Sequence, residues 1–387
     1  MRVLLYGGGF NPPHLGHLAA LERAREALNP DLTLVIPDGE PPHKPFPKGS
    51  PASKERLLLS QLNFGDLANA EISDLALCRD GPCYMIDTIT LLRRRFPTDE
   101  LVLLVGSDML LSFGTWYRSA ELLRECTLAA LCRGEGEMDA ISAQARTLEA
   151  RGGKVILLDH EPVEISSSRL RAMLPERMGK SYLKDEVYRE IIRLRLYGAK
   201  PELSWLREQV IPMLDPKRVP HVLGCEEMAR SLALRWDLDP EAAAEAGILH
   251  DMTKRWPVEE QLAYCEKMGI ELDEGERKNP QLFHARTGAV AARELFGAPD
   301  EICDAIRWHT TGKPIMSSFE KLLYLADMIE PNRSFPGVDK LRELAFLDLN
   351  LAMSYALEQS VKSLRKRNME VYKDTLDAYS WYRAYGK

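Results

Sequence analysis

The chain has 387 residues, 45% of them hydrophobic, and a formal net charge of −7. This length predicts two domains, and the acidic balance argues against a general nucleic-acid binder, which needs a basic excess. We expect a soluble, cytoplasmic protein, because no run approaches the roughly 18 uninterrupted apolar residues of a membrane span and the first apolar run is too short for a signal peptide. The 7 cysteines form no CxxC pair, so neither a disulfide framework nor a thiolate zinc site is expected.

The N-terminal stretch combines a strand, a glycine turn and two spaced histidines. The apolar run from Val3 to Tyr6 predicts a buried parallel strand that stops at three consecutive glycines. From about His14 the pattern predicts an amphipathic helix, with His14 and His17 on one face. Glycines let backbone N–H groups approach a ligand, and two imidazoles at a helix N-terminus suit phosphate. The alternative is a tight turn with two packing histidines.

Strands and helices then alternate through the first half. Strands are expected at 31–36, 70–75 and 101–105, and helices at 53–64 and after Tyr84. This alternation predicts a doubly wound α/β domain over residues 1–197, Rossmann-like, with a mostly parallel sheet. Ligands of such sheets bind beyond the carboxyl ends of the strands.

Four later loops carry side chains suited to a nucleotide. These loops contain a lysine, three serines and an arginine, which suit phosphates, and a tryptophan, which offers a flat face to a stacked heterocycle. The ordinary alternatives are a solvated lysine, helix caps and a buried core tryptophan. In chain order the candidates are Lys44 in PPHK, then Tyr84, Asp87, Thr88, Gly106, Asp108, Trp116 and Tyr117, and finally Ile165, Ser166, Ser167, Ser168 and Arg171 in ISSSRLR.

These motifs resemble a known family. The run from Gly8 to His17, GGFNPPHLGH, is similar to the signature of the HxGH nucleotidyltransferase superfamily, with Asn11 where Asp is commoner. Together with PPHK, YxxDT, GxDxLxxFxxWY and ISSSRLR in this order, it makes residues 1–197 resemble the bacterial nicotinate-nucleotide adenylyltransferases. That family transfers adenylyl from ATP to nicotinate mononucleotide with Mg²⁺, giving deamido-NAD and pyrophosphate.

The resemblance implies roles for the candidates. The acceptor's own 5′-phosphate would attack ATP, so His14 and His17 would stabilise charge rather than remove a proton. Phosphopantetheine and nicotinamide mononucleotide are alternative acceptors. Trp116 and the PPHK loop favour a pyridine nucleotide, and the family resemblance implies nicotinate mononucleotide, the acid form. ATP would contact Gly8, Gly9, Phe10, His14, His17, Lys44, Gly106, Asp108, Ile165, Ser166, Ser167, Ser168 and Arg171, and the mononucleotide would contact Tyr84, Asp87, Thr88, Trp116 and Tyr117.

From Pro201 the pattern changes to nearly continuous helix, which predicts an all-α domain over 203–387. His250 and Asp251 end an apolar helix and place an imidazole beside a carboxylate, as in divalent-metal sites. With His221 opening an earlier helix and Asp327 closing a later one, they form the H…HD…D signature of the HD phosphohydrolase superfamily. His284 and His309 then suffice for a second metal bridged by Asp251, although each histidine taken alone is more simply a buried structural residue.

LHDMTK, PxLFHxxxG, AIRWHTTG and YLADMIEPNRSFPGV make residues 203–387 resemble the HD-domain diadenosine tetraphosphatases, which cleave symmetrically to two ADP. The resemblance implies a dinuclear centre of iron, with manganese open, in which Asp251 is catalytic. Candidate polyphosphate contacts are Lys254, Arg307 and Arg333, with solvated basic side chains as the alternative. A non-catalytic nucleotide sensor is the second reading of this half, and the complete ligand set argues against it. The oligomeric state is left open.

Overall fold

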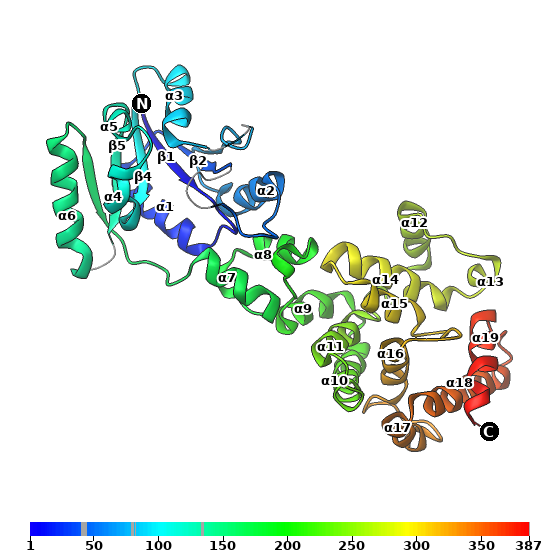
Figure 1. Ribbon diagram of the computed structural model, residues 1–387. Coiled ribbons are helices and arrows are strands. Elements are labelled where there is room, and N and C mark those ends of the chain that lie inside the picture. The colour runs from blue at the N-terminus through cyan, green and yellow to red at the C-terminus, as the bar shows by residue number, and fades with distance from the viewer. Residues whose placement is uncertain (40–44, 79–80, 82, 133–134, 387) are drawn as a thin grey trace. The chain divides into compact units, whose positions relative to one another are not determined.

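The computed structural model describes residues 1–387 except 40–44, 79–80, 82, 133–134 and 387 (Figure 1). Contacts divide the chain into two compact units, Met1–Lys200 and Pro201–Lys387. The PPHK loop, and with it Lys44, lies outside the described residues.

The first unit contains a six-stranded parallel sheet in the order β3-β2-β1-β4-β5-β6. From β1 the chain adds β2 and β3 on one side, and then returns to add β4, β5 and β6 on the other side of β1. The direction in which strands are added therefore reverses between β1 and β4. Ligands bind at such a reversal, beyond the carboxyl ends of the strands. The strands are β1 (Arg2–Gly8), β2 (Leu32–Pro37), β3 (Ala70–Ile72), β4 (Glu100–Gly106), β5 (Thr127–Cys132) and β6 (Val155–Asp159).

Helices cover both faces of this sheet (Figure 1). Successive strand residues point to opposite faces, so Val3 and Leu5 join the core beneath α3, α5 and α6, and Leu4 joins the core beneath α1. The predicted doubly wound α/β fold is therefore confirmed. The helices of this unit are α1 (Leu15–Leu28), α2 (Ser53–Phe64), α3 (Met85–Arg95), α4 (Ser107–Ser112), α5 (Ser119–Glu125), α6 (Glu135–Ala150), α7 (Ser167–Met173) and α8 (Asp185–Arg193).

The observed boundaries lie within two residues of the predicted ones, except at the end of one strand. The strand expected over 70–75 ends at Ile72, because β3 is an edge strand that pairs on one side only, with Thr33 to Val35 of β2. The helix expected from about His14 begins at Leu15, and His14 is its N-cap. The helix predicted over 53–64 is observed with those bounds.

The second unit is helical, as predicted, and residues 201–386 contain no strand. Helix α10 packs against α11 and α16, and α15 packs against α14 and α16, so these five helices surround a common core. The α-helices are α9 (Leu203–Val210), α10 (Val219–Arg235), α11 (Pro240–Leu249), α12 (Val258–Met268), α13 (Glu274–Arg277), α14 (Phe283–Phe296), α15 (Asp300–Trp308), α16 (Ser318–Ile329), α17 (Val338–Leu347), α18 (Leu349–Lys366) and α19 (Lys373–Tyr382).

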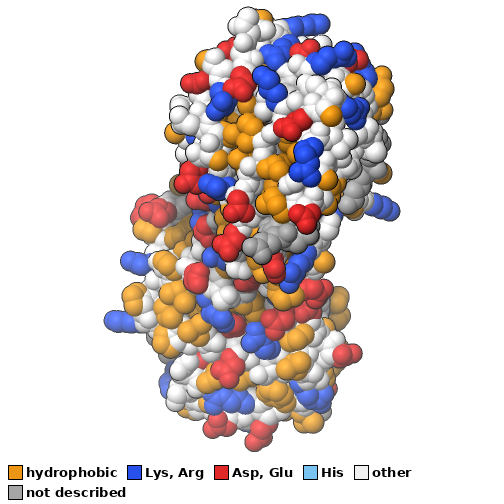
Figure 2. Space-filling view, turned by 90° about the vertical axis from the view of Figure 1, so that its left-hand side faces the viewer, with side chains coloured by type: hydrophobic (Ala, Val, Ile, Leu, Met, Phe, Trp, Pro, Cys, Tyr) orange, Lys and Arg blue, Asp and Glu red, His pale blue; other side chains and the backbone are white. Residues whose placement is uncertain are grey.

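The surface carries charges of both signs. On the face drawn in Figure 2, lysines and arginines are interspersed with aspartates and glutamates, with no field of one sign. All seven cysteines are free thiols in the structure. Among the described residues, no helix is long and apolar enough to cross a membrane.

Two candidate active sites

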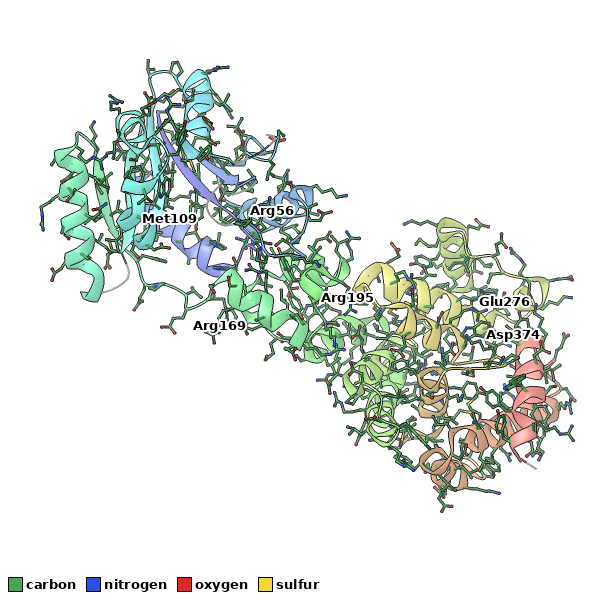
Figure 3. The ribbon with its side chains drawn as sticks, in the orientation of Figure 1. Arg56, Met109, Arg169, Arg195, Glu276 and Asp374 are labelled. Atoms are coloured by element: carbon green, nitrogen blue, oxygen red, sulfur yellow. The ribbon has the colours of Figure 1, made fainter. Side chains whose placement is uncertain are left out.

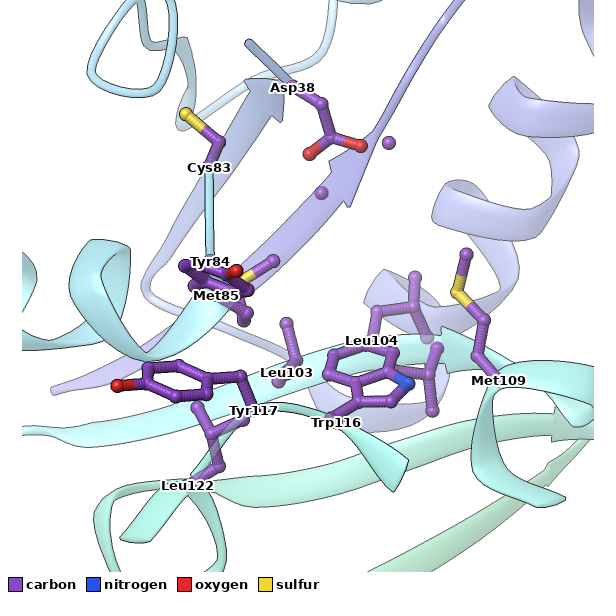
Figure 4. Close-up of a pocket in the computed structure, with 13 residues that line it drawn as sticks. Asp38, Cys83, Tyr84, Met85, Leu103, Leu104, Met109, Trp116, Tyr117 and Leu122 are labelled. Atoms are coloured by element: carbon purple, nitrogen blue, oxygen red, sulfur yellow. The ribbon is translucent and has the colours of Figure 1, made fainter. Parts of the chain in front are cut away.

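The first candidate site is a pocket at the carboxyl ends of β1 and β4, where the strand order reverses. Figure 4 shows Trp116 and Tyr117 along one side of it and Asp38 toward the opposite end. The rings of Tyr84 and Tyr117 lie 4.5 Å apart, and Trp116 is half-buried with its ring 5.1 Å from a core phenylalanine. Three sequence candidates for the acceptor thus line one aromatic pocket.

Beside this strand end, His14 and His17 cap α1 reciprocally. The backbone N–H of His17 donates to Nδ1 of His14 at 3.3 Å, and the backbone N–H of His14 donates to Nδ1 of His17 at 3.2 Å. The two rings stack with centroids 3.7 Å apart. Since both Nδ1 atoms accept hydrogen bonds, each neutral ring carries its proton on Nε2, where it is a donor free to meet a ligand oxygen.

Burial keeps both imidazoles neutral. It lowers the pKa of His14 to about 4, and it lowers the pKa of His17 well below its usual value, with a further contribution from His14. Gly16 permits this packing, because a Cβ at position 16 would lie 3.0 Å from the His14 ring and 3.3 Å from Ile165. A side chain larger than that of the glycine in the HLGH run would therefore crowd the His14 ring and Ile165.

The ISSSRLR turn lies against the loop that precedes these histidines. Ser166 is the N-cap of α7 and accepts from the backbone N–H of Arg169 at 3.2 Å. The next serine, Ser167, donates to the carbonyl oxygen of Pro12 at 2.8 Å. Arg171 donates to the carbonyl oxygen of Asn11 at 2.6 Å and to the Ser168 hydroxyl at 3.0 Å. Only one serine is therefore a cap, and Ser167 and Arg171 tie the two segments together.

The remaining first-half candidates occupy different positions. Gly8 ends β1 in the pocket wall, whereas Phe10 is 2% exposed and its side chain belongs to the core beneath α1. Gly106 caps α4, with the exposed Asp108 in its first turn. In the first turn of α3, Asp87 is half-buried and Thr88 is buried. Gly9, the last of this set, lies beside Phe46, whose ring would be 3.1 Å from a Cβ at that position.

Sequence reasoning missed two charged residues here, Asp38 and Arg56. Asp38 lies in the pocket, and burial raises its pKa to about 6. Arg56, labelled in Figure 3, is buried and donates to the carbonyl oxygens of Asp38 at 2.7 Å and Gly9 at 3.2 Å. Asp38 directly follows β2, a position that the strand-end rule identifies, whereas nothing near Arg56 in the sequence indicates its partners.

The second candidate site lies inside the helical unit, where histidines from four helix ends meet. The Nε2 atoms of His221 and His250 are 3.4 Å apart, and those of His284 and His309 are 3.3 Å apart. In His250 and His309, Nδ1 lies 2.7 Å from a backbone carbonyl oxygen, to which it donates, so Nε2 is the ring nitrogen that faces the cluster. The sequence-predicted histidines are thus brought together as two facing pairs.

Asp251 lies between the two pairs. Its Oδ2 is 3.7 Å from Nε2 of His221 and 3.5 Å from Nε2 of His250. Its Oδ1 is 3.3 Å from Nε2 of His284 and 3.6 Å from Nε2 of His309. Although complete burial raises the pKa of this carboxyl, the facing imidazoles hold it well below its usual value, so the group is ionised.

This donor set fits divalent metal ions. Two imidazole nitrogens bound to one ion at about 2.1 Å lie roughly 3.0 to 3.4 Å apart at bond angles of about 90–110°, close to both observed spacings. Burial lowers the pKa of His284 to about 4 and also lowers that of His309, so both are neutral, as ligands must be. Among the described residues, two groups of three lie close enough to hold one ion each. The first is His221, His250 and Asp251, and the second is Asp251, His284 and His309.

Asp327 completes the first group. Its Oδ1 lies 3.0 Å from Nε2 of His221 and 3.9 Å from Nε2 of His250. Arg333 donates to the same oxygen at 2.6 Å, and Lys254 lies 3.2 Å from Oδ1 of Asp251. Two of the three predicted polyphosphate contacts therefore border the cluster.

The third predicted contact, Arg307, is engaged elsewhere. Its side chain is 14% exposed and lies 3.2 Å from the Glu276 carboxylate. Burial lowers the pKa of Arg307 to about 10, although Glu276 and Asp374, both labelled in Figure 3, raise it. Arg307 thus has a carboxylate partner within the fold, which the sequence did not indicate.

Two residues that the sequence reasoning missed also hold the cluster. Arg218 donates to Oδ2 of Asp251. Glu330 is buried and lies 3.1 Å from Nδ1 of His221, so it orients that ring. Glu330 follows Asp327 by three residues, and Arg218 precedes His221 by three residues. A spacing of three places both members of each pair on the same side of a helix, and this was the available sequence signal.

Comparisons with known proteins find a family for each half of the chain. Residues 5–173 match the cytidylyltransferase-like family model, and residues 218–332 match the HD domain model. The chain is 43% identical over 171 residues to a symmetrical bis(5′-nucleosyl)-tetraphosphatase of Bacillus subtilis, covering 43% of this chain and 90% of the relative. It is 34% identical over 192 residues to a probable nicotinate-nucleotide adenylyltransferase of Exiguobacterium sibiricum, covering 50% of this chain and 96% of the relative.

One relative extends over both units. The chain is 25% identical over 371 residues to a probable nicotinate-nucleotide adenylyltransferase/Ap4A hydrolase of Mycoplasma pneumoniae, covering 94% of this chain and 100% of the relative. The HD match and the tetraphosphatase relative imply use of a divalent metal. The chain therefore belongs, through its first half, to the nicotinate-nucleotide adenylyltransferases and, through its second half, to the HD-domain symmetrical bis(5′-nucleosyl)-tetraphosphatases.

Proposed function

We propose that the protein is bifunctional: its first half transfers adenylyl from ATP to nicotinate mononucleotide, and its second half hydrolyses diadenosine tetraphosphate symmetrically to ADP. The observation that carries the proposal is that one chain contains both assembled sites, the capped histidine pair beside an aromatic pocket and the two facing histidine pairs around Asp251. The full-length relative named for both activities supports it.

In the first half, we assign the acceptor to the aromatic pocket and the phosphates of ATP to the histidine pair. Trp116 would stack on the pyridine ring, worth about 0.5–1.5 kcal/mol beyond area burial. The Nε2–H groups of His14 and His17 would donate to phosphoryl oxygens and stabilise the charge that develops on them. The acceptor's 5′-phosphate is already a nucleophile, so no residue has to deprotonate it. Mg²⁺ bound to ATP would supply further positive charge.

A comparison of acceptors tests this half. With ATP and Mg²⁺ in excess, we expect kcat/KM for nicotinate mononucleotide to exceed that for nicotinamide mononucleotide at least about 10-fold, since one well-placed charged contact is worth that factor. Phosphopantetheine should give no product. The measurement is release of pyrophosphate together with chromatography of the dinucleotide. A preference for the amide would overturn the assignment of the acceptor.

In the second half, we assign one metal to His221, His250, Asp327 and Asp251 and a second to His284, His309 and Asp251, with iron or manganese as the metal. Bound there, the metals would supply Lewis-acid polarisation of the phosphoryl oxygens. The chain's own cations then act beside them, because Lys254 and Arg333 lie at the edge of the cluster and can neutralise the oligophosphate.

Hydrolysis of diadenosine tetraphosphate by protein loaded with Fe²⁺ or Mn²⁺ tests this half. We expect ADP as the single nucleotide product, and we expect chelation to remove the activity and metal to restore it. A non-catalytic nucleotide sensor is the alternative function. Protein that binds metal and the dinucleotide but releases no ADP would favour the sensor.

A further inference from the structure

A second pocket of the helical unit is lined by the C-terminal part of α18 and the segment that joins α16 to α17. Figure 1 shows where these helices lie. Its volume is about 640 Å³, within the range of about 300–1,000 Å³ that small-molecule sites have. Phe335 contributes apolar surface, and Arg333, Lys362, Lys366 and Arg367 contribute positive charge. A pocket with an aromatic wall and several cations suits a nucleotide.

This pocket adjoins the histidine cluster through two of its residues. Thr310 directly follows His309, and Arg333 reaches Oδ1 of Asp327 at 2.6 Å while also lining the pocket. The Oγ1 atom of Thr310 is buried and has no hydrogen-bond partner among the described residues. A buried hydroxyl without a partner is costly, and a ligand oxygen or ring nitrogen in the pocket would satisfy it.

The charges of the pocket are only partly compensated. Lys362 lies 2.8 Å from Glu358, one turn earlier on α18. Lys366 and Arg367 are exposed at the end of the same helix, and neither has a carboxylate within ion-pair distance in the part of the chain that the structure describes. Two unpaired cations beside an apolar wall indicate a ligand that carries both negative charge and a flat apolar group.

We propose that this pocket binds one nucleoside diphosphate half of the dinucleoside tetraphosphate, its phosphates on Lys366 and Arg367 and its base against Phe335, so that the midpoint of the oligophosphate lies at the histidine cluster. The inference rests on the function proposed for the second half. It also gives a physical reason for symmetrical products, because a half-substrate held in the pocket fixes which phosphoanhydride bond reaches the cluster.

The test compares two charge reversals on the same helix end in the metal-loaded, full-length protein. Lys366→Glu alters a pocket residue, and Arg365→Glu makes the same change on an exposed neighbour that does not line the pocket. For Lys366→Glu we expect KM for diadenosine tetraphosphate to rise about 10-fold with kcat within about twofold, and Kd for a methylene-bridged, non-hydrolysable analogue to rise by the same factor. Arg365→Glu and Lys366→Arg should remain within about twofold of the parent.

Equal effects of Lys366→Glu and Arg365→Glu on Kd, or no effect of either, would overturn the proposal. A Kd that responds as expected in a protein that releases no ADP would instead support the pocket and refute the hydrolytic function. The experiment therefore distinguishes failure of the pocket proposal from failure of the hydrolytic function, because binding of the analogue needs no turnover.

Discussion

Replacing Asp251 with asparagine should lower the rate of diadenosine tetraphosphate hydrolysis by roughly 10³-fold, the equivalent of about 4 kcal/mol of transition-state stabilisation. The reason is geometric: each carboxylate oxygen of Asp251 faces its own histidine pair. Asparagine keeps the shape but supplies one oxygen, so one pair would face an N–H donor that cannot bind a cation. The measurements are ADP release and metal content, which should fall from two ions per chain to one or fewer.

Two comparisons make this result specific. Asp304→Asn makes the same change on an exposed position of α15 and should leave hydrolysis and metal content unchanged. The adenylyltransferase rate of the Asp251→Asn protein should also stay at the parent value, because its site lies in the other unit. Retention of both metals with full hydrolysis would refute the assignment of Asp251 as the shared ligand.

Replacing His17 with alanine should lower the adenylyltransferase kcat by about 10²–10³-fold, the usual cost of removing one preorganised donor to a developing oxyanion. The KM for nicotinate mononucleotide should change far less, since the acceptor is assigned to the aromatic pocket. Burial holds the pKa values of both histidines below neutrality, so kcat of the parent protein should show no ionisation of these groups between pH 6 and 8. Steady-state rates across pH check both statements.

Asparagine at position 17 separates the two roles of this histidine. Its side-chain oxygen can accept the backbone N–H of His14, as Nδ1 of His17 does at 3.2 Å, but its NH2 donors lie on a shorter side chain and do not reach the position of Nε2. We therefore expect His17→Asn to lose as much kcat as His17→Ala. Near-normal turnover of the asparagine variant would mean that His17 only caps the helix, and equal losses in kcat and mononucleotide affinity would contradict its role as a charge stabiliser.

Local patterns predicted most of the fold that surrounds the first site. The strand predicted from Val3 to Tyr6 is observed as β1, which continues through the first two glycines to Gly8, and α2 has the predicted bounds. The edge strand β3 was predicted too long, because its length depends on how far β2 lies beside it. The strands β5 and β6 were not predicted individually; their apolar runs, TLAALC and VILLD, were the available signals.

The sequence indicated which residues meet at the sites where the signal follows from spacing along one element. The histidines and aspartates of the cluster stand at helix ends with recognisable neighbours. Arg56, Arg218 and Glu276 were missed because their partners are distant in sequence, and nothing local distinguishes such a residue from a solvated charge. Arg307 is the opposite case, because its motif suggested a ligand contact. In the structure it donates a hydrogen bond to the carboxylate of Glu276, thirty-one positions earlier in the chain.

The reciprocal capping of His14 and His17 has a consequence for how mutations at these positions combine. Each side chain holds the other's backbone N–H, so loss of either ring releases a hydrogen bond that fixes its partner. The double alanine variant should then cost much less than the product of the two single losses. The pair behaves as one coupled unit, and no separate share of the rate can be credited to either histidine.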